Sequence, residues 1–321
     1  MNRHVLVGTD GSPNADDALR YAARFFRGVE DVDVTAATVA PPISPALLQG
    51  GFTFEAEKSR LSRLDEVRKR QEEECARILS RAGRILSEEG MEEARIHVQT
   101  ILGAQSVLKA LVHLARSGSF DAVLVGRRGL GQVVSFFMGS ISSGLLGALG
   151  DVPVWIVDTP DEPRKVLIAL DSCEECLCVV DHTAFMLAGV PDARITVLHV
   201  LPRFRPFFSS ELSGSCADLE SMLWERAEEP VRIFLEKAAG IFQDAGLDPS
   251  RIDLKVKRGG AGVAREILKE YGQGGYGTLV VGRRGVGGFE AVFPGSVSTK
   301  LISAVSRGAV WVVGHTKPPS A

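Results

Sequence analysis

Short apolar runs alternate with longer amphipathic segments along the whole chain of 321 residues. Runs such as "AVLV" and "TLVV" are continuously apolar, which is typical of parallel strands covered by helices on both faces. We predict strands at residues 4–9, 33–39, 94–100, 121–126 and 154–157, and again at 165–170, 194–200, 252–257, 278–282 and 310–313. The amphipathic segments between them predict helices at 13–27, 60–89, 104–117, 140–149, 174–188, 216–245, 261–271 and 296–307, with Pro230 expected to kink or restart the long one.

The second half of the chain repeats the first. "HVLVGTDGS" (4–12) matches "KVLIALDSC" (165–173), "DAVLVGRRG" matches "GTLVVGRRG", and "VPVWIVD" matches "GAVWVVG". A repeat of this length indicates duplication of a βαβ domain. The charged and proline-containing stretch "DTPDEPR" between the halves is typical of a linker. We therefore predict domains at residues 1–158 and 165–321, joined by a linker at 159–164.

One glycine spacing occurs in both halves. It is "GRRGLGQVVSFFMGS" at 126–140 and "GRRGVGGFEAVFPGS" at 282–296, each time after a strand and before a helix. In an open parallel sheet such loops lie at the carboxyl edge, where ligands bind. The free N–H groups at a helix N-terminus bind anions, and the hydroxyls of Ser140, Ser142, Ser296 and Ser298 would add donors. The spacing therefore indicates two phosphate sites.

The alternative is that these glycines serve only tight turns and the serines only cap helices. Two loops of identical spacing favour phosphate binding over that interpretation. Neither G-x-x-x-x-G-K-[ST] nor G-x-G-x-x-G after the first strand occurs, so hydrolysis on a P-loop and dinucleotide redox chemistry lose support. No G-x-S-x-G nucleophile motif occurs either, which lowers every hydrolase interpretation.

The glycine spacing, together with an aspartate closing the first strand of each half, resembles the ATP-binding branch of the universal stress protein family. The resemblance covers nearly all of both halves. It implies an α/β fold of two tandem Rossmann-like (adenine nucleotide alpha hydrolase-like) domains, each an open parallel sheet of five strands in the order 3-2-1-4-5 with four helices. It also implies ATP at the carboxyl edge, and pairing of the two halves through their last strands, "VWIV" and "VWVV".

Carried onto this sequence, the resemblance places Asp10 and Asp171 beside the ribose and any bound Mg²⁺, and backbone groups of Val39 and Val200 at the adenine. One arginine of each Arg-Arg pair is expected to approach the phosphates. The expected nucleotide-binding residues are Thr9, Asp10, Val39, Gly126, Arg127, Gly129, Gly139, Ser140, Ile141 and Ser142 in the first half, and Asp171, Val200, Gly282, Arg283, Gly285, Gly295, Ser296, Val297 and Ser298 in the second. The second half departs from the first at one point: "LDSCEECLC" replaces "TDGSPNAD", so the helix entry beside Asp171 is chemically different and more acidic.

Composition and charge argue against nucleic acid and membranes as binding partners. A net charge of −3 gives no electrostatic reason to expect nucleic acid or an anionic membrane. Residues 129–150 carry no charge and are long enough to span a bilayer, but they are rich in Gly and Ser, and Glu290 and Lys300 interrupt the matching stretch, so we expect no membrane span. The cysteines are odd in number and unevenly spread, unlike a secreted disulfide framework, and no export signal is visible; a cytoplasmic location is expected.

Cys173, Cys176 and Cys178 form a C-x-x-C-x-C cluster at the expected start of a helix, where metal or redox chemistry is conceivable. No second cluster completes a zinc site, so structural thiols are the favoured interpretation. The histidines show no metal-ligand spacing, and His199, at the end of a strand, is interpreted as a satisfied core or edge residue. We expect no metal site.

Together these patterns predict an ATP-binding tandem protein that acts as a nucleotide-responsive stress or signalling module rather than an efficient enzyme. Slow ATP hydrolysis or self-phosphorylation stays open, as do a homodimer and an unidentified protein partner. Two alternatives remain: an interaction module without nucleotide, and a thiol or metal sensor through Cys173, Cys176 and Cys178. The apolar loops 41–54 and 201–214 are expected to cover the nucleotide, contact a partner or fold back on the core.

Overall fold

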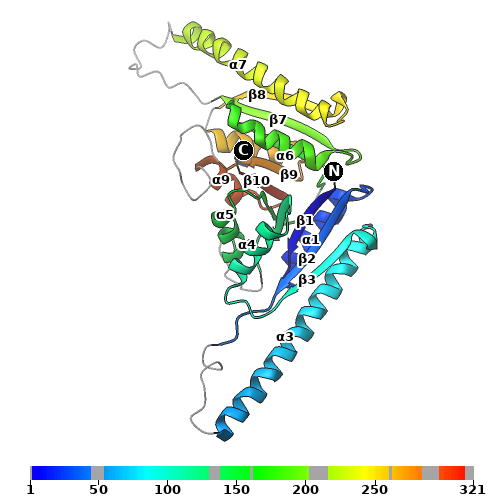
Figure 1. The fold of residues 1–321 in the computed structure, drawn as a ribbon. Coiled ribbons are helices and arrows are strands. Elements are labelled where there is room, and N and C mark those ends of the chain that lie inside the picture. The colour runs from blue at the N-terminus through cyan, green and yellow to red at the C-terminus, as the bar shows by residue number, and fades with distance from the viewer. Residues whose placement is uncertain are drawn as a thin grey trace, which may run out of the picture. The chain divides into compact units, whose positions relative to one another are not determined.

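The computed structural model describes residues 2–44, 54–129, 138–159, 162–201, 216–259, 262–283 and 296–314. The chain divides into two compact units, Met1–Pro160 and Asp161–Ala321 (Figure 1). The division falls inside the segment 159–164 that the sequence predicts to be a linker. We call the two parts unit 1 and unit 2.

Unit 1 is a parallel sheet in the order β3-β2-β1-β4-β5, the order that the family resemblance implies. In the first strand, Val5 lies opposite Val34 of β2 and Ala122 of β4. The strands are β1 (Arg3–Gly8), β2 (Val32–Val39), β3 (Ile96–Ile101), β4 (Ala122–Gly126) and β5 (Val154–Val157). The helices are α1 (Pro13–Phe26), α3 (Phe54–Glu88), α4 (Val107–Ser117) and α5 (Ser140–Ala148), with a short 3₁₀ turn, η1 (Glu93–Arg95).

Unit 2 has the same topology, with its parallel strands in the order β8-β7-β6-β9-β10. These are β6 (Lys165–Ala169), β7 (Arg194–Leu201), β8 (Ile252–Arg258), β9 (Thr278–Gly282) and β10 (Ala309–Val313). The helices are α6 (Leu177–Leu187), α7 (Cys216–Asp244), α8 (Val263–Gly274) and α9 (Ser296–Ala304), with 3₁₀ turns η2 (Glu174–Cys176) and η4 (Pro249–Arg251). The fold predicted from the sequence is confirmed in both units.

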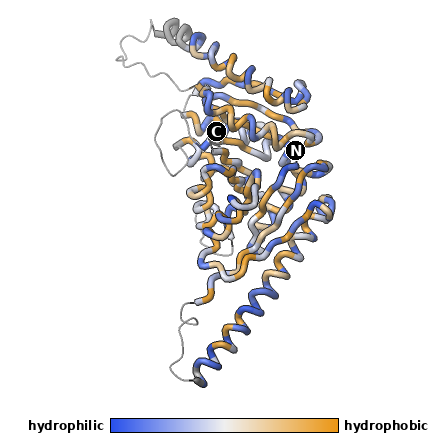
Figure 2. Tube along the Cα trace, viewed as in Figure 1, coloured by the Kyte–Doolittle hydropathy of each residue, from blue (hydrophilic) through white to orange (hydrophobic). Residues whose placement is uncertain are grey.

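Helices cover both faces of each sheet, so most residues of the inner strands are buried. In unit 1, α1 packs against α3, and α4 against α5; in unit 2 the pairs are α6 with α7 and α8 with α9. The hydropathy colours follow this layering, because the inner strands are apolar while much of α3 is polar (Figure 2). The edge strand β3 is mostly exposed, and the edge strand β8 is half-buried to exposed. Trp155 and Trp311, each on the last strand of its unit, are fully buried.

Some boundaries differ from the prediction. The segment 174–188 divides into the 3₁₀ turn η2 and α6, and α4 begins only after Ser106, whose hydroxyl accepts a hydrogen bond from the Lys109 N–H. The expected restart at Pro230 is wrong, because α7 continues through it. Proline has no N–H, so the carbonyl oxygen four residues earlier has no helical donor. Pro230 is exposed, so water can donate to that oxygen instead. None of the helices in the described part of the chain is long and apolar enough to cross a membrane.

Candidate functional site

The carboxyl ends of β1 and β4 bring two of the predicted residues together in unit 1. Asp10 follows β1, and the Ser12 N–H donates to its Oδ1 over 3.0 Å. Gly11 between them has φ = +74°, a conformation that favours glycine and allows this tight turn. Gly129 follows β4 and lies so close to the Asp10 carboxylate that a Cβ added there would overlap Oδ2. The Asp10 carboxylate and the Gly129 backbone therefore form one wall of the candidate site.

Gly126 has a different neighbour from the one the sequence suggests. A Cβ at this position would lie 2.6 Å from the backbone C and O atoms of Asn14 and 3.0 Å from the backbone N of Ala15. The close backbone approach that Gly126 permits is thus to the first turn of α1. This contact sets the start of α1 directly against the end of β4.

The glycine loop returns to the sheet at Gly139. Its N–H donates to the Arg127 carbonyl oxygen over 2.9 Å, and α5 begins at the next residue with Gly139 as its N-cap. A glycine cap has no side chain to accept a hydrogen bond, and the first helical bond runs from the Ser143 N–H to the Gly139 carbonyl oxygen. Helix geometry therefore leaves the N–H groups of Ser140, Ile141 and Ser142 without an intrahelical acceptor. Amides of this kind are suited to an anion, which is the role that the spacing predicts for them.

In each unit, the serine two residues after the glycine motif donates its hydroxyl proton to a backbone carbonyl oxygen of that unit. Ser142 is buried, and its Oγ donates to the Gly126 carbonyl oxygen over 2.8 Å. In unit 2, Ser298 Oγ donates to the Gly282 carbonyl oxygen over the same 2.8 Å. A hydroxyl has one proton to donate, so neither hydroxyl is directed to a phosphate in this arrangement. Both serines instead hold the helix start against the end of the neighbouring strand.

The Arg127 side chain forms an ion pair within unit 1, and its expected contact with the phosphates stays a prediction. Its guanidinium is buried, with Nε 3.2 Å from Oδ2 of Asp158, just after β5. Burial raises the pKa of Asp158, and the Arg127 and Arg128 charges oppose that rise. Arg128, the other arginine of the pair, is exposed. If one arginine of the pair approaches a ligand, the geometry favours Arg128.

Thr9 and Val39 lie on the same edge of unit 1. Thr9 is buried; its N–H donates to the Ala37 carbonyl oxygen over 2.8 Å, and its Oγ1 accepts from the Gly11 N–H over 3.2 Å. Val39 is the last residue of β2, opposite Ile101 of β3. Its backbone is therefore at the carboxyl edge, as expected for an adenine contact.

In unit 2 only part of the predicted site is described. Gly285 and Gly295 lie outside the described residues, and Ser296 and Val297 open α9, with the Ser296 side chain also outside them. Asp171 follows β6, and its Oδ1 accepts from the Ser172 N–H over 3.1 Å. Val200 is buried in β7. Because β6 pairs with β9, Asp171 and the end of β9 share one edge of the sheet.

Arg283, which matches Arg127, is half-buried, and its N–H donates to the Val313 carbonyl oxygen over 2.8 Å. The residue after Val313 is Gly314, where unit 1 has Asp158. Unit 2 therefore lacks a carboxylate at the position that holds Arg127 in unit 1.

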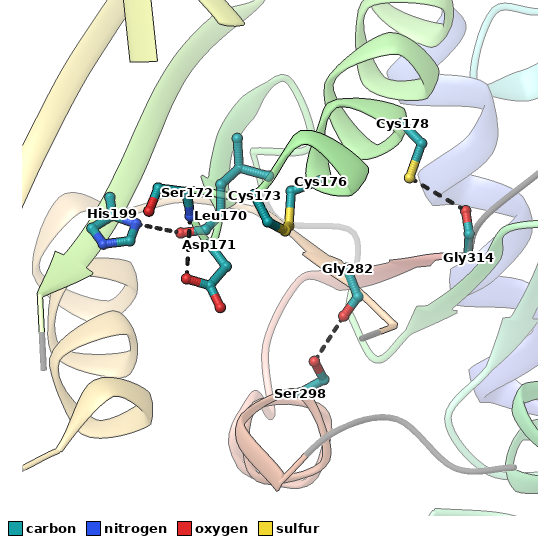
Figure 3. Close-up of a disulfide and its surroundings, with 10 residues drawn as sticks. All are labelled: Leu170, Asp171, Ser172, Cys173, Cys176, Cys178, His199, Gly282, Ser298 and Gly314. Carbon is teal, nitrogen blue, oxygen red and sulfur yellow. Dashed lines mark hydrogen bonds between the residues drawn. A yellow bond between two sulfur atoms is a disulfide. The ribbon is translucent and has the colours of Figure 1, made fainter. Parts of the chain in front are cut away.

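The cysteine cluster is the largest departure from the sequence prediction. Cys173 and Cys176 form a disulfide beside Asp171, so the expectation of structural thiols is wrong for these two residues (Figure 3). Cys178 keeps its thiol, which donates to the Gly314 carbonyl oxygen over 3.7 Å, and burial raises its pKa. Among the described residues no group of His, Cys, Asp and Glu could hold a metal ion. The C-x-x-C spacing was the signal for a disulfide, but spacing alone could not distinguish it from a dithiol.

His199 fits the interpretation of a satisfied core residue. It is buried in β7, and its Nδ1 lies 3.0 Å from the Leu170 carbonyl oxygen. Burial lowers the pKa of His199, and the hydrogen bond to Leu170 and the nearby Asp171 charge oppose this shift only in part. The ring is therefore neutral near pH 7.

A separate hollow of about 670 Å³ lies in unit 1 between β3 and α4. Its polar lining includes Gln99, Gln105, Lys109 and His113, and none of the predicted nucleotide residues borders it. It is open to solvent, and the glycine motif contributes nothing to it, so it is a weaker candidate than the carboxyl edge.

Comparison with known proteins agrees with the repeat. The profile of the universal stress protein family matches residues 1–158 and 162–313. A universal stress protein of Mycolicibacterium smegmatis (strain ATCC 700084 / mc(2)155) is 26% identical over 313 residues, which cover 94% of each chain. One of Mycobacterium tuberculosis (strain ATCC 25618 / H37Rv) is 27% identical over 319 residues, covering 94% of this chain and 92% of its own.

Solved structures show the same fold over the full length. The crystal structure of a universal stress protein from Archaeoglobus fulgidus DSM 4304 superposes with a TM-score of 0.60 at 17% identity, over 97% of this chain and 98% of that chain. A putative universal stress protein from Pseudomonas aeruginosa UCBPP-PA14 gives a TM-score of 0.59 at 14% identity, over 98% and 94%. At these identities the likeness concerns the fold alone.

Proposed function

Because the chain belongs to the universal stress protein family, with two such domains in tandem, we propose that it binds ATP at the carboxyl edge of each unit. One observation supports this most: α5 begins at a glycine cap whose following amides lack an intrahelical acceptor, beside the contact between Asp10 and Gly129. Amides at a helix start suit a phosphate chain. A carboxylate at the next loop suits a ribose hydroxyl or a phosphate-bound Mg²⁺.

Within unit 1, each predicted residue then has a distinct part. The amides of Ser140 and Ile141 bind phosphate, Asp10 binds ribose or metal, and the Val39 backbone contacts adenine. Gly126 and Ser142 position the two helix starts rather than touch the ligand. Arg128, and not Arg127, supplies positive charge at the loop.

We propose a nucleotide-responsive signalling module rather than an efficient enzyme. Donors that bind the ground state and the transition state equally do not lower a reaction barrier. Slow hydrolysis or self-phosphorylation would be compatible with this proposal, whereas rapid turnover would contradict it. We further propose a cytoplasmic location and a protein partner that reads the nucleotide state; fractionation and crosslinking with and without ATP test these two points.

The test is isothermal titration calorimetry of the full chain with ATP and Mg²⁺. Gly139→Val places a side chain at the helix start, where even a Cβ would lie 3.3 Å from the Arg127 carbonyl oxygen. We expect it to remove binding in unit 1 and so lower the measured stoichiometry. Gly147→Ala is the matched control, because Gly147 is in the same helix and a Cβ there would meet nothing within 4 Å.

An unchanged affinity and stoichiometry in Gly139→Val would contradict the assignment of unit 1. A chain that purifies without nucleotide and whose melting temperature does not rise with ATP would instead support the interaction module that binds no nucleotide.

A further inference from the structure

The first helix of each unit, α1 or α6, has its N-terminus held by a different kind of interaction. In unit 1, Ser12 is the N-cap of α1, and its Oγ accepts from the Ala15 N–H over 3.3 Å. The matching residues of unit 2 are Cys173 and Cys176, which are linked by the disulfide. Cys173 caps η2 and makes no side-chain hydrogen bond there. The disulfide thus replaces a hydrogen-bonded cap with a covalent one.

We propose that Cys173–Cys176 is a reversible redox site that controls the start of α6, with a low-molecular-weight thiol such as glutathione as its reductant. Cys173 is half-buried, whereas Cys176 is only 6% exposed. An incoming thiolate can therefore reach the Cys173 sulfur more readily than the Cys176 sulfur. Cys176 is the N-cap of the 11-residue α6, where the helix dipole stabilises the thiolate that would leave.

The exchange balances in two steps. A thiolate attacks Cys173 Sγ, the bond between the two protein sulfurs breaks, and Cys176 leaves as a thiolate and takes a proton. A second thiolate then attacks the small-molecule sulfur of the mixed disulfide and releases Cys173, which is also protonated. Two electrons reduce the protein disulfide, and two thiols become one small-molecule disulfide. That small-molecule disulfide drives the reverse reaction.

The local geometry favours re-formation of the disulfide after it has been reduced. The Cα atoms of Cys173 and Cys176 are 5.3 Å apart, within the usual range for a disulfide, and the Cys176 N–H donates to the Cys173 carbonyl oxygen over 2.9 Å. This backbone bond does not depend on the sulfurs, so it would keep the two thiols near each other after reduction. The acidic residues between them oppose a thiolate, but Glu174 is paired with Lys237 of α7, with 2.8 Å between Nζ and Oε2.

The site lies against the candidate nucleotide edge of unit 2. Asp171 is two residues before Cys173, and its carboxylate accepts from the Ser172 N–H (Figure 3). After reduction, backbone hydrogen bonds such as that of the Cys176 N–H hold this turn without the covalent link, so it would open more often. Asp171 and the first amides of α6 would then be held less firmly in place. An effect on ATP binding rests on the function proposed above, whereas the redox reaction and the loosening do not.

The experiment uses the full chain equilibrated in a series of glutathione ratios. Thiols are trapped by alkylation in denaturant, and each cysteine is then measured by mass spectrometry. We expect Cys173 and Cys176 to titrate together, in one two-electron transition, while Cys178 stays a thiol. Cys178→Ala, on the same helix, is the control and should leave that transition in place. Two cysteines that stay reduced at every ratio, or that pair with other cysteines, would overturn the proposal.

Hydrogen exchange without nucleotide measures how much the disulfide stabilises the start of α6. On reduction, amides at the start of α6 should exchange roughly fivefold to tenfold faster, the effect of losing one cap. Cys173→Ser should restore a cap like that of Ser12 and remove the response to glutathione. Cys173→Ala should exchange fast under all conditions. Equal exchange in the oxidised and reduced wild type would overturn the proposal even if ATP binds, and loss of ATP binding alone would not.

Discussion

Replacing Gly126 by alanine tests whether this glycine serves packing, as the structure indicates, or only ligand approach. The added Cβ would lie 2.6 Å from Asn14 backbone atoms, where ordinary contacts need about 3.4–4 Å, so α1 or β4 must shift by about 1 Å. The obstacle is backbone, and no rotamer change can relieve it. Overpacking of this kind costs about 1–3 kcal/mol.

Part of that cost is offset, because alanine restricts the unfolded chain more than glycine does, by about 0.4–1 kcal/mol. The net loss of unfolding free energy in unit 1 is therefore about 1–2 kcal/mol. For a unit of this size that corresponds to a fall in melting temperature of roughly 2–8 °C. Urea unfolding gives the free energy, scanning calorimetry gives the temperature, and hydrogen exchange in α1 shows that the loss is in unit 1.

Gly83→Ala is the matched control. Gly83 is inside α3, and a Cβ there would meet nothing within 4 Å. This substitution should stabilise the protein by about 0.5–1 kcal/mol, since glycine is unfavourable in a helix. The two changes add the same methyl group and should have opposite signs. A Gly126→Ala protein as stable as the wild type would refute the packing role of this glycine.

Two further substitutions test ionisable side chains whose pKa is shifted by burial. Arg127→Met should cost about 3 kcal/mol at pH 7 by leaving Asp158 buried without its partner. Burial already raises the pKa of Asp158, so the deficit should shrink as pH falls and the carboxylate takes a proton; a deficit that is constant between pH 7 and pH 5 in urea unfolding would refute this account. In unit 2, burial lowers the pKa of His182 to about 3, so the wild type should lose stability as pH falls from about 6.5, where the unfolded state gains a proton that the folded state does not. His182→Phe keeps a ring against Trp311 and should flatten this dependence, and an unchanged pH profile of unfolding would show that another group is responsible.

The sheet could be predicted because its signal is local. Runs such as Val5–Val7 and Leu279–Val281 are apolar on both faces, which only a covered parallel strand requires. The order of strands followed from the resemblance and not from the runs themselves. The contact between Gly129 and Asp10 was predicted only in part. The glycine spacing pointed to Gly129 and the end of the first strand pointed to Asp10, but their proximity depends on the pairing of β1 with β4.

The direction of a side chain could not be predicted where its partner is distant in sequence. Arg127 turns to Asp158 because β4 pairs with β5, which places the residues after these strands together. Similarly, a serine at the start of a helix can donate outward or to a neighbouring carbonyl, and the sequence around Ser142 fits both. Only the position of the Gly126 carbonyl oxygen decides between them.

A comparison of matched positions in the two units shows where the site keeps the same residue type and where the residue type differs. A serine that donates to the end of the neighbouring strand is present in both units, because the approach of helix and strand depends on backbone geometry. The cap of the first helix differs, since a hydroxyl acceptor and a disulfide can each hold the same turn. A disulfide, however, adds a dependence on the redox state that a hydroxyl does not have. A change confined to this turn would therefore make unit 2 responsive to thiols while leaving its sheet, and all of unit 1, unaltered.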